Sequence, residues 1–327
     1  MQKGKHTCNV ETVRSGNETR TDTIRDLRRG NSFIHANRGR WHVSIDWKLP
    51  NCMVNERRPS PISGVENGLS PRLGMSEQHG LFPKRISTIY PGPPNGAHIE
   101  FVCEVSEGGT YYCKSDKSGR SVRATELFCT RFADHLGVAT ADAAVVEDEI
   151  GRSFFGSRHD ISTATDTRLS AFLTESHLNE LGQPADWPGR HLSQLYALDM
   201  LLANPDRDLR NFVLAVEGSM MRLRAIDFAA AELSHLADCQ FPIAQSRTVL
   251  VGKMLRDRHG FFVDSALEMV DRIEAVPRDV IAGFVGEIPS EWLTQARREE
   301  ICETWSSQPY RERIKALRAG LKDGTLL

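Results

Sequence analysis

Residues 204–211 read Asn204-Pro205-Asp206-Arg207-Asp208-Leu209-Arg210-Asn211, and Asp227 follows sixteen residues after Asn211 in Ile226-Asp227-Phe228. An Asp, an Asn five residues later and a further Asp between apolar residues form the spacing that phosphoryl-transfer enzymes use. Asp206 could orient or deprotonate an acceptor hydroxyl. The amide oxygen of Asn211 and the carboxylate of Asp227 could hold Mg²⁺ against the phosphates of ATP.

A plain turn is the alternative interpretation of this loop, since Asn-Pro-Asp is a common turn composition. Asp227 argues against it, because a carboxylate between Ile226 and Phe228 is costly unless it is paired or ligating. Asp208 is a second carboxylate, but the five-residue spacing to Asn211 favours Asp206. The loop also carries two arginines, at 207 and 210, which could neutralise phosphate charge or pair locally.

A lysine and a glutamate upstream fit the same chemistry. Lys114 ends a predicted strand, so its ammonium can project from a rigid element into a cleft and contact phosphates. Glu126, on the helix predicted next, is the best partner to fix it. In isolation both would be interpreted as solvated surface residues, but the Asp206, Asn211 and Asp227 set lies downstream in the appropriate order.

From about residue 87 the apolar pattern becomes regular, with strands first and helices later, which indicates an α+β architecture with two lobes. Glycines at 108 and 109 mark a turn between the first two strands, and Gly137 is a candidate helix cap. We predict strands at 99–105, 110–114, 143–147 and 153–155, helices at 122–136 and 190–203, a hairpin of 212–216 with 221–226, and a helical region from 246 onward.

The composition excludes several classes of protein. The 327 residues carry a net charge of −2 and are 40% hydrophobic, enough for a real core without a strongly electrostatic partner. No apolar run reaches the length of a membrane span, and the first residues lack the apolar segment of a secretory signal. The seven scattered cysteines contain no Cys-x-x-Cys pair. This pattern suits a reduced, cytoplasmic protein better than a disulfide scaffold or a zinc site.

Residues 1–86 differ from the rest of the chain. Residues 1–60 contain twelve Lys and Arg but only six Asp and Glu. Several Pro and Gly residues interrupt the stretch 59–74. One alternating piece at 41–47 could be a strand. We interpret 1–86 as a basic, disordered leader or a translated segment upstream of the true start. A nucleic-acid-binding arm or a small ordered subdomain are the alternatives.

Taken in order, the motifs resemble the HipA-like kinases, atypical kinases with a phosphatidylinositol-kinase-like fold. The resemblance covers roughly 87–305 and rests on these stretches: Lys114, Ala124-Thr125-Glu126-Leu127, Leu136-Gly137-Val138, Phe155-Gly156-Ser157, the 204–211 loop, Ala225-Ile226-Asp227-Phe228 and Ile288-Pro289-x-Glu291-Trp292. It implies a two-lobed kinase-like fold over 87–327, with an antiparallel-sheet N-lobe at about 87–160 and a mainly helical C-lobe at about 161–327.

The resemblance also implies roles for individual residues. Lys114 would contact ATP and Glu126 would orient it, while Asp206 would be the catalytic base and Asn211 and Asp227 would bind Mg²⁺. The adenine-side hinge would come from the segment between Glu147 and Phe155. A glycine-rich phosphate loop is not evident; Pro91-Gly92-Pro93-Pro94-Asn95-Gly96 is the nearest candidate, and a plain surface loop is its alternative.

The sequence therefore predicts an ATP- and Mg²⁺-dependent phosphotransferase, most simply a protein serine/threonine kinase whose partner is a protein substrate. The first alternative is a nucleotide-binding pseudokinase that works as an interaction module. The second is a kinase-fold enzyme that transfers the nucleotide or acts on a small molecule or lipid. A nucleic-acid-associated role would depend on the 1–86 leader.

Overall fold

The computed structural model describes residues 32–37, 40–45, 82–91, 99–116, 120–160, 162–178, 181–182, 185–217 and 220–327. The chain divides into two units, Met1–Leu73 and Gly74–Leu327, and each is considered by itself. In the first, β1 (Ser32–Asn37) and β2 (Arg40–Ile45) pair as an antiparallel hairpin, and β2 covers most of the strand predicted at 41–47. The remainder of 1–81 and the proline-glycine stretch at 92–96 lie outside the described residues.

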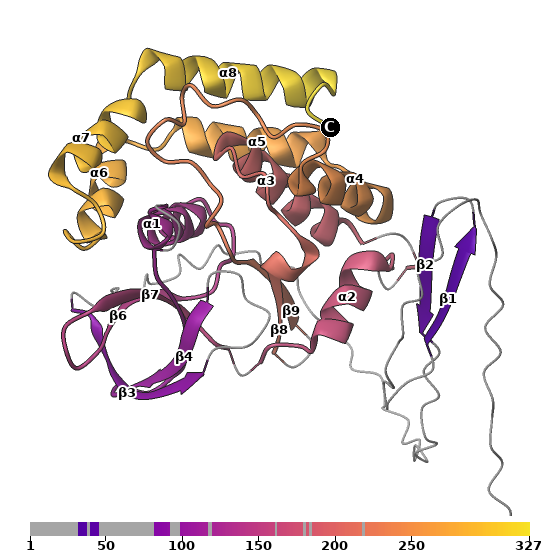
Figure 1. Ribbon diagram of the computed structural model, residues 1–327. Helices are drawn as coiled ribbons and strands as arrows, with labels where there is room; N and C mark the ends of the chain where they lie inside the picture. Colours follow the sequence, from indigo (N-terminus) through magenta and orange to yellow (C-terminus); the bar gives the residue numbers. More distant parts are fainter. Residues whose placement is uncertain are drawn as a thin grey trace, which may run out of the picture. The chain divides into compact units, whose positions relative to one another are not determined.

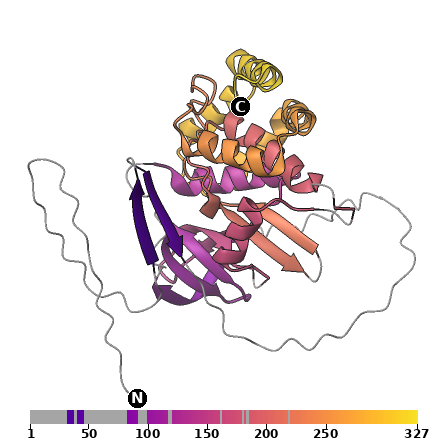
Figure 2. The same ribbon diagram turned by 90° about the vertical axis from the view of Figure 1, so that its right-hand side faces the viewer.

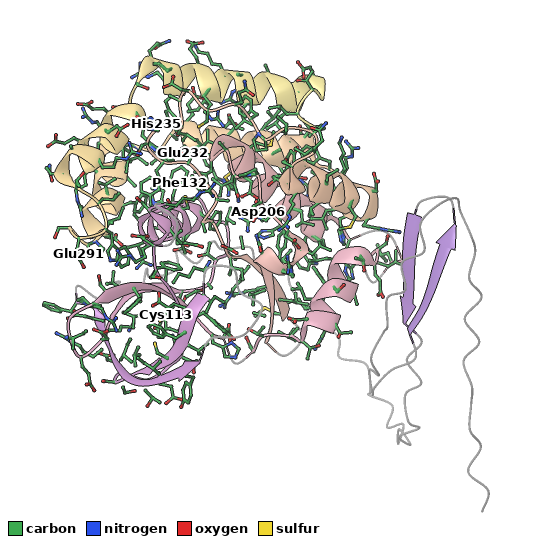
Figure 3. All side chains as sticks on the ribbon, viewed as in Figure 1. Cys113, Phe132, Asp206, Glu232, His235 and Glu291 are labelled. Carbon is green, nitrogen blue, oxygen red and sulfur yellow. The ribbon has the colours of Figure 1, made fainter. Side chains whose placement is uncertain are left out.

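The second unit begins with five strands that close into a barrel in the order β3-β4-β5-β7-β6 (Figure 1). They are β3 (Lys84–Pro91), β4 (Ile99–Val105), β5 (Thr110–Lys114), β6 (Ala143–Glu147) and β7 (Ser153–Arg158). Alternate side chains point inward and form a small apolar core of Cys103, Val105, Tyr111, Cys113, Val146 and Phe154. Figure 3 shows Cys113 within this barrel.

The sheet predicted as antiparallel is instead a closed barrel with one parallel pairing. The strand pairings are antiparallel except one: β3 runs parallel to β6 through the Lys84–Val146 and Arg85–Glu147 pairs. This pairing covers the two edges that an open sheet would leave free. The prediction missed it because β3 lies at the border of the irregular N-terminal region and was not recognised as a strand.

Most of the helices gather on one side of the barrel, where α1 packs against β6 and β7 of the barrel and against α6 (Figures 1 and 2). They are α1 (Val122–His135), α2 (Asp166–Thr174), α3 (Asp186–Leu201), α4 (Arg247–His259), α5 (Val263–Glu274), α6 (Arg278–Glu287), α7 (Gln295–Thr304) and α8 (Gln308–Asp323). The strongly apolar α3 packs against α4, α5 and α8, so it is the central helix of the larger core. The chain is thus mixed α and β.

A hairpin follows α3 and carries the loop of interest. A short 3₁₀ turn, Leu209–Asn211, leads into β8 (Phe212–Glu217), which pairs with β9 (Met220–Ala225) in an antiparallel register. Both strands were predicted within one residue at their ends. The 204–211 loop is therefore held between a buried helix and a strand, and Asp227 follows the end of β9.

A polar cluster ties the barrel to the C-terminal helices. Ser153 Oγ donates a 2.5 Å hydrogen bond to Glu291, and the indole of Trp292 donates a 2.7 Å bond to the same hydroxyl. Arg123 of α1 donates to the Ser153 carbonyl at 2.7 Å and lies over the Trp292 ring. The Glu291-Trp292 pair, one of the stretches behind the family resemblance, thus has a structural role that holds β7 and α1 to the segment before α7.

The five cysteines of the described part are free. Within the described residues, no helix is both long and apolar enough to cross a membrane.

His191 in α3 is expected to make the stability of the folded protein sensitive to acid. Burial lowers its pKa to about 4, and its Nε2 atom is buried without a hydrogen-bond partner among the described residues. The folded state therefore binds fewer protons than the unfolded state between pH 6.5 and 4, so stability is full above about pH 6.5 and falls with pH. We expect a loss of about 3 kcal/mol from this group by pH 4.

Urea unfolding of wild type and His191→Leu between pH 7 and 4.5 measures this contribution. The variant is expected to lose less stability than wild type over that interval, while the exposed-histidine variant His135→Gln follows wild type. Parallel pH curves for wild type and His191→Leu would contradict the assignment.

Candidate active site

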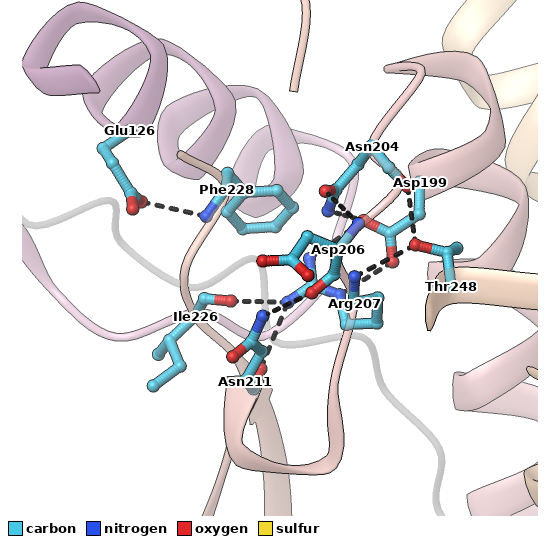
Figure 4. Close-up of polar contacts among 9 residues, drawn as sticks. All are labelled: Glu126, Asp199, Asn204, Asp206, Arg207, Asn211, Ile226, Phe228 and Thr248. Carbon is cyan, nitrogen blue, oxygen red and sulfur yellow. Dashed lines mark hydrogen bonds and ion pairs between the residues drawn. The ribbon is translucent and has the colours of Figure 1, made fainter. Parts of the chain in front are cut away.

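The 204–211 loop is anchored to α3 by a buried ion pair. Asp199, fully buried in α3, accepts two hydrogen bonds from the Arg207 guanidinium, at 2.8 Å and 2.9 Å. It also accepts one from the amide of Asn204, at 2.8 Å (Figure 4). Arg207 is only 3% exposed, so local pairing, and not phosphate contact, is what the structure gives this arginine. A bidentate pair in the interior fixes the loop's position relative to α3.

The other side of Arg207 joins the loop to the segment before Asp227. Its Nη1 atom donates to the carbonyl oxygens of Asn211, at 3.1 Å, and Ile226, at 2.5 Å. The backbone N–H of Ile226 in turn donates to the Asn211 carbonyl at 3.0 Å, and the guanidinium lies over the Phe228 ring. One arginine therefore sets the spacing between the two segments that carry Asn211 and Asp227.

Asp206 is held by its backbone and leaves its side chain at the surface. Its N–H donates to the Asn204 side-chain oxygen at 3.2 Å, and its carbonyl accepts from the amide of Asn211 at 2.9 Å. Its carboxylate is 51% exposed. In Figure 4 Asp206 and Asn211 lie close together in one loop. This is the geometry of a carboxylate presented to an incoming group by a rigid support.

Lys114, Glu126 and Asp227 form a second charged cluster that joins three elements. Lys114 Nζ, at the end of β5, lies 2.5 Å from Glu126 Oε1 on α1 and 2.9 Å from Asp227 Oδ1. The other oxygen of Glu126 accepts the backbone N–H of Phe228 at 3.0 Å. The predicted pairing of Lys114 with Glu126 is thus present. Asp227 is the second carboxylate that pairs with the same lysine.

Burial and neighbouring charges act in opposite directions on the pKa values of Lys114 and Asp227. Burial acts to lower the pKa of Lys114, but Glu126 and Asp227 outweigh it and hold that pKa above its usual value. Burial also acts to raise the pKa of Asp227, but Lys114 outweighs it and brings that pKa to about 2. A cation and an anion therefore persist side by side at neutral pH, as phosphate and metal binding require.

Two residues of the site region have a backbone with positive φ. Ala203, just before it, has φ 49°, and Asp227 has φ 61°; they are the non-glycine residues with positive φ in the described part of the chain. This conformation costs a side-chain-bearing residue about 1 to 2 kcal/mol, although Asp tolerates it better than Ala. Such strain persists where the surroundings over-determine the backbone, which here are the contacts made by Arg207 and Glu126.

Asn211 and Asp227 fit a magnesium ion by their chemistry. The nitrogen of the Asn211 amide is used on the Asp206 carbonyl, which leaves its oxygen for a ligand, and the Asp227 carboxylate is 36% exposed. Within the described residues no group of three His, Cys, Asp or Glu side chains could hold a metal. Two oxygen donors suit Mg²⁺, which takes its remaining ligands from phosphates and water.

Glu147 does not join these residues. It ends β6 and forms a 2.8 Å ion pair with Arg85 of β3, at the pairing that closes the barrel. Its place beside the adenine stays a prediction. The proline-glycine candidate for the phosphate loop lies at 92–96, outside the described residues.

Three residues of the site were missed by the sequence reasoning. Asp199 could have been noticed as a lone carboxylate in an apolar helix, because such a group needs a buried partner. Thr248 and Arg247 begin α4 and contact loop residues 39 to 44 positions away. No local pattern indicates such contacts.

The chain was compared with families of known proteins, with curated proteins and with solved structures. The model of the HipA-like kinase family matches residues 86–318. A search of the curated proteins found no match.

Solved structures that are similar to the chain include the following two. One is the proinflammatory kinase CtkA of Helicobacter pylori, with 11% identity, 74% of this chain and 99% of that chain covered, and a TM-score of 0.48. The other comes from the Shewanella oneidensis MR-1 toxin–antitoxin complex of HipA, HipB and operator DNA. It has 14% identity, with 76% of this chain and 67% of that chain covered, and a TM-score of 0.38.

Proposed function

We propose that this chain, which belongs to the HipA-like kinase family, is an ATP- and Mg²⁺-dependent phosphotransferase that acts on a serine or threonine hydroxyl of a protein. The family match confirms the resemblance drawn from the motifs. The observation that carries the proposal is the Lys114–Glu126–Asp227 cluster: a buried lysine on a strand, fixed by a helix glutamate and shared with the aspartate proposed as a metal ligand. This arrangement has the parts that phosphoryl transfer requires.

In this proposal the described part of 87–160 acts as an N-lobe, and 161–327 acts as a C-lobe. The barrel and α1 would supply Lys114 and Glu126, and the loop after α3 would supply Asp206 and Asn211. The chain divides into two units after Leu73, and the family match starts at residue 86. Both observations support a functional unit that excludes most of the basic N-terminal region.

The chain's own residues have separate tasks in the transfer. Lys114 binds the α- and β-phosphates, and Glu126 keeps its ammonium in place. Asp206 orients the acceptor hydroxyl and takes its proton as the oxygen attacks the γ-phosphorus in line with the leaving oxygen. Asn211 and Asp227 would hold Mg²⁺, which offsets the charge on the phosphates when bound.

Incubation of the purified full chain with Mg²⁺ and ATP, followed by intact-mass spectrometry and ADP quantification, tests this function. Phosphoryl transfer adds about 80 Da to the chain itself or to an added protein. Transfer of the nucleotide adds about 329 Da and would replace the proposal by the nucleotidyltransferase alternative. Nucleotide binding without ADP release or added mass would instead favour the pseudokinase.

The setting of the reaction is part of the same proposal. We expect a cytoplasmic protein whose partner is a protein substrate. Free cysteines and the absence of a membrane-spanning helix among the described residues fit that compartment. Substrate lipids or small molecules are tested by the same mass assay, with the added mass then found on those molecules.

A further inference from the structure

Arg247 contacts the proposed catalytic carboxylate, and the reaction scheme above does not use it. It is the first residue of α4, and its Nη1 atom lies 3.1 Å from Asp206 Oδ1 and 3.6 Å from Asp208 Oδ2. The Arg247 and Asp206 side chains are 56% and 51% exposed. Both groups are therefore accessible to solvent, and so to an incoming acceptor.

The start of α4 is fixed to the loop by Thr248, which is only 1% exposed. Its hydroxyl donates to the Asn204 carbonyl at 2.6 Å and accepts the N–H of Arg207 at 3.0 Å. Its own N–H donates to the Pro205 carbonyl at 3.2 Å. Ser246 caps the same helix by accepting the N–H of Val249. Arg247 thus stands between a capping residue and a clamped one, so its Cα position is set relative to the loop.

Asp206, by contrast, has a fixed backbone and a lightly held side chain. Within the described residues, Arg247 is the one hydrogen-bond or ion-pair partner of its carboxylate, and it contacts Oδ1. A surface carboxylate without a partner samples several rotamers. One anchored oxygen restricts that motion and leaves Oδ2 open to a second group.

We propose that Arg247 is a positioning residue for phosphoryl transfer: it holds Asp206 by Oδ1 so that Oδ2 meets the acceptor hydroxyl. This inference rests on the proposed function. The opposite interpretation of the pair is a latch that blocks Asp206 until substrate arrives. The two differ in sign, because removal of a positioning residue slows turnover and removal of a latch accelerates it.

The test compares initial rates of ADP release and phosphorylated product for wild type, Arg247→Ala, Arg247→Lys and Arg258→Ala at saturating Mg²⁺-ATP. Arg258 is the matched control, since it is an exposed arginine of the same helix, α4, and lies outside the loop. We expect Arg247→Ala to lower kcat by about 10- to 100-fold with the KM for ATP within about twofold, and Arg258→Ala to stay within about twofold of wild type.

Rescue separates positioning from a structural role. Lysine at 247 is expected to restore part of the rate, and millimolar guanidinium ion should accelerate Arg247→Ala but not wild type. Thermal melts of the variants should stay close to wild type, because an exposed ion pair contributes about 0 to 1 kcal/mol.

The inference is overturned if Arg247→Ala turns over as fast as Arg258→Ala or faster than wild type. It is also overturned if its slower rate comes with a large loss of thermal stability and no rescue by lysine or guanidinium. A wild type that releases no ADP and transfers no phosphate overturns the proposed function, and this inference with it. The failure of the function and the failure of the inference alone are therefore distinguishable.

Discussion

Replacement of Asp206 by alanine is expected to lower the kcat of phosphoryl transfer by about 10³-fold while the protein stays folded. The carboxylate is half exposed, so its removal leaves no buried charge behind. The bonds that hold the loop involve the backbone of Asp206 and survive the change. Initial rates at saturating Mg²⁺-ATP, with a thermal melt of the same sample, measure both halves of the prediction.

Asp227 is best tested as Asp227→Asn and not as alanine. Its φ of 61° is tolerated by Asn but strained for Ala, so the asparagine variant removes the charge without a backbone penalty. We expect a loss of kcat of about 10²-fold or more, because the proposed metal site loses its carboxylate. Full turnover in either Asp206→Ala or Asp227→Asn would sink the assignment. Asp257→Ala, which removes a 75% exposed carboxylate on α4, is the control expected to be neutral.

A large effect on stability is expected from Lys114→Met. Its partner Glu126 is 1% exposed, so the variant leaves a buried carboxylate without its cation. Breaking a buried pair in this way costs about 3 to 5 kcal/mol. For a unit of this size each kcal/mol lowers Tm by about 2 to 4 °C, which gives a decrease of about 6 to 20 °C. Differential scanning calorimetry measures it, and Lys315→Met, at a 65% exposed lysine, should stay near wild type.

The double variant Lys114→Met with Glu126→Gln identifies the cause. Glutamine has no charge to bury and can still accept the N–H of Phe228, so the double variant should recover most of the lost Tm. Burial already raises the pKa of Glu126, and loss of Lys114 raises it further. A raised folded-state pKa means that the single variant becomes relatively more stable as pH falls, so its deficit should be smaller at pH 5 than at pH 7.5. Equal instability of the single and double variants, at both pH values, would show that lost packing is responsible.

The polar residues of the site were predictable where the chain itself places unusual chemistry. Asp227 lies between two apolar residues, and such a carboxylate needs a partner whatever the fold. Lys114 ends a strand whose alternation is clear, and Glu126 follows on a helix with a plain apolar face. Their order along the chain indicated that they meet, and the structure brings all three within hydrogen-bond distance.

Contacts between distant segments were not predictable in this way. Thr248 and Arg247 reach the loop because α4 starts there, which depends on how 228–246 folds back, and no local pattern encodes that path. The parallel pairing of β3 with β6 closes the barrel through long-range register, so a pattern that identifies single strands cannot reveal it. The same closure places Glu147 against Arg85, apart from the charged cluster.

The contacts of Arg207 have a consequence for protein engineering. This side chain bonds to a helix, to the end of the loop and to the end of β9, so the groups proposed for base and metal duties share one rigid support. A library that randomises Arg207 or Asp199 would mostly sample unfolded chains. Residues 229–246, which join this support to α4, make none of the Arg207 contacts described above. Leu233, Ser234 and Leu236 in this segment are buried, so diversity aimed at a new acceptor is best introduced at its exposed positions, 235, 238, 240 and 243–245. There the surface can be altered while the reacting groups keep their spacing.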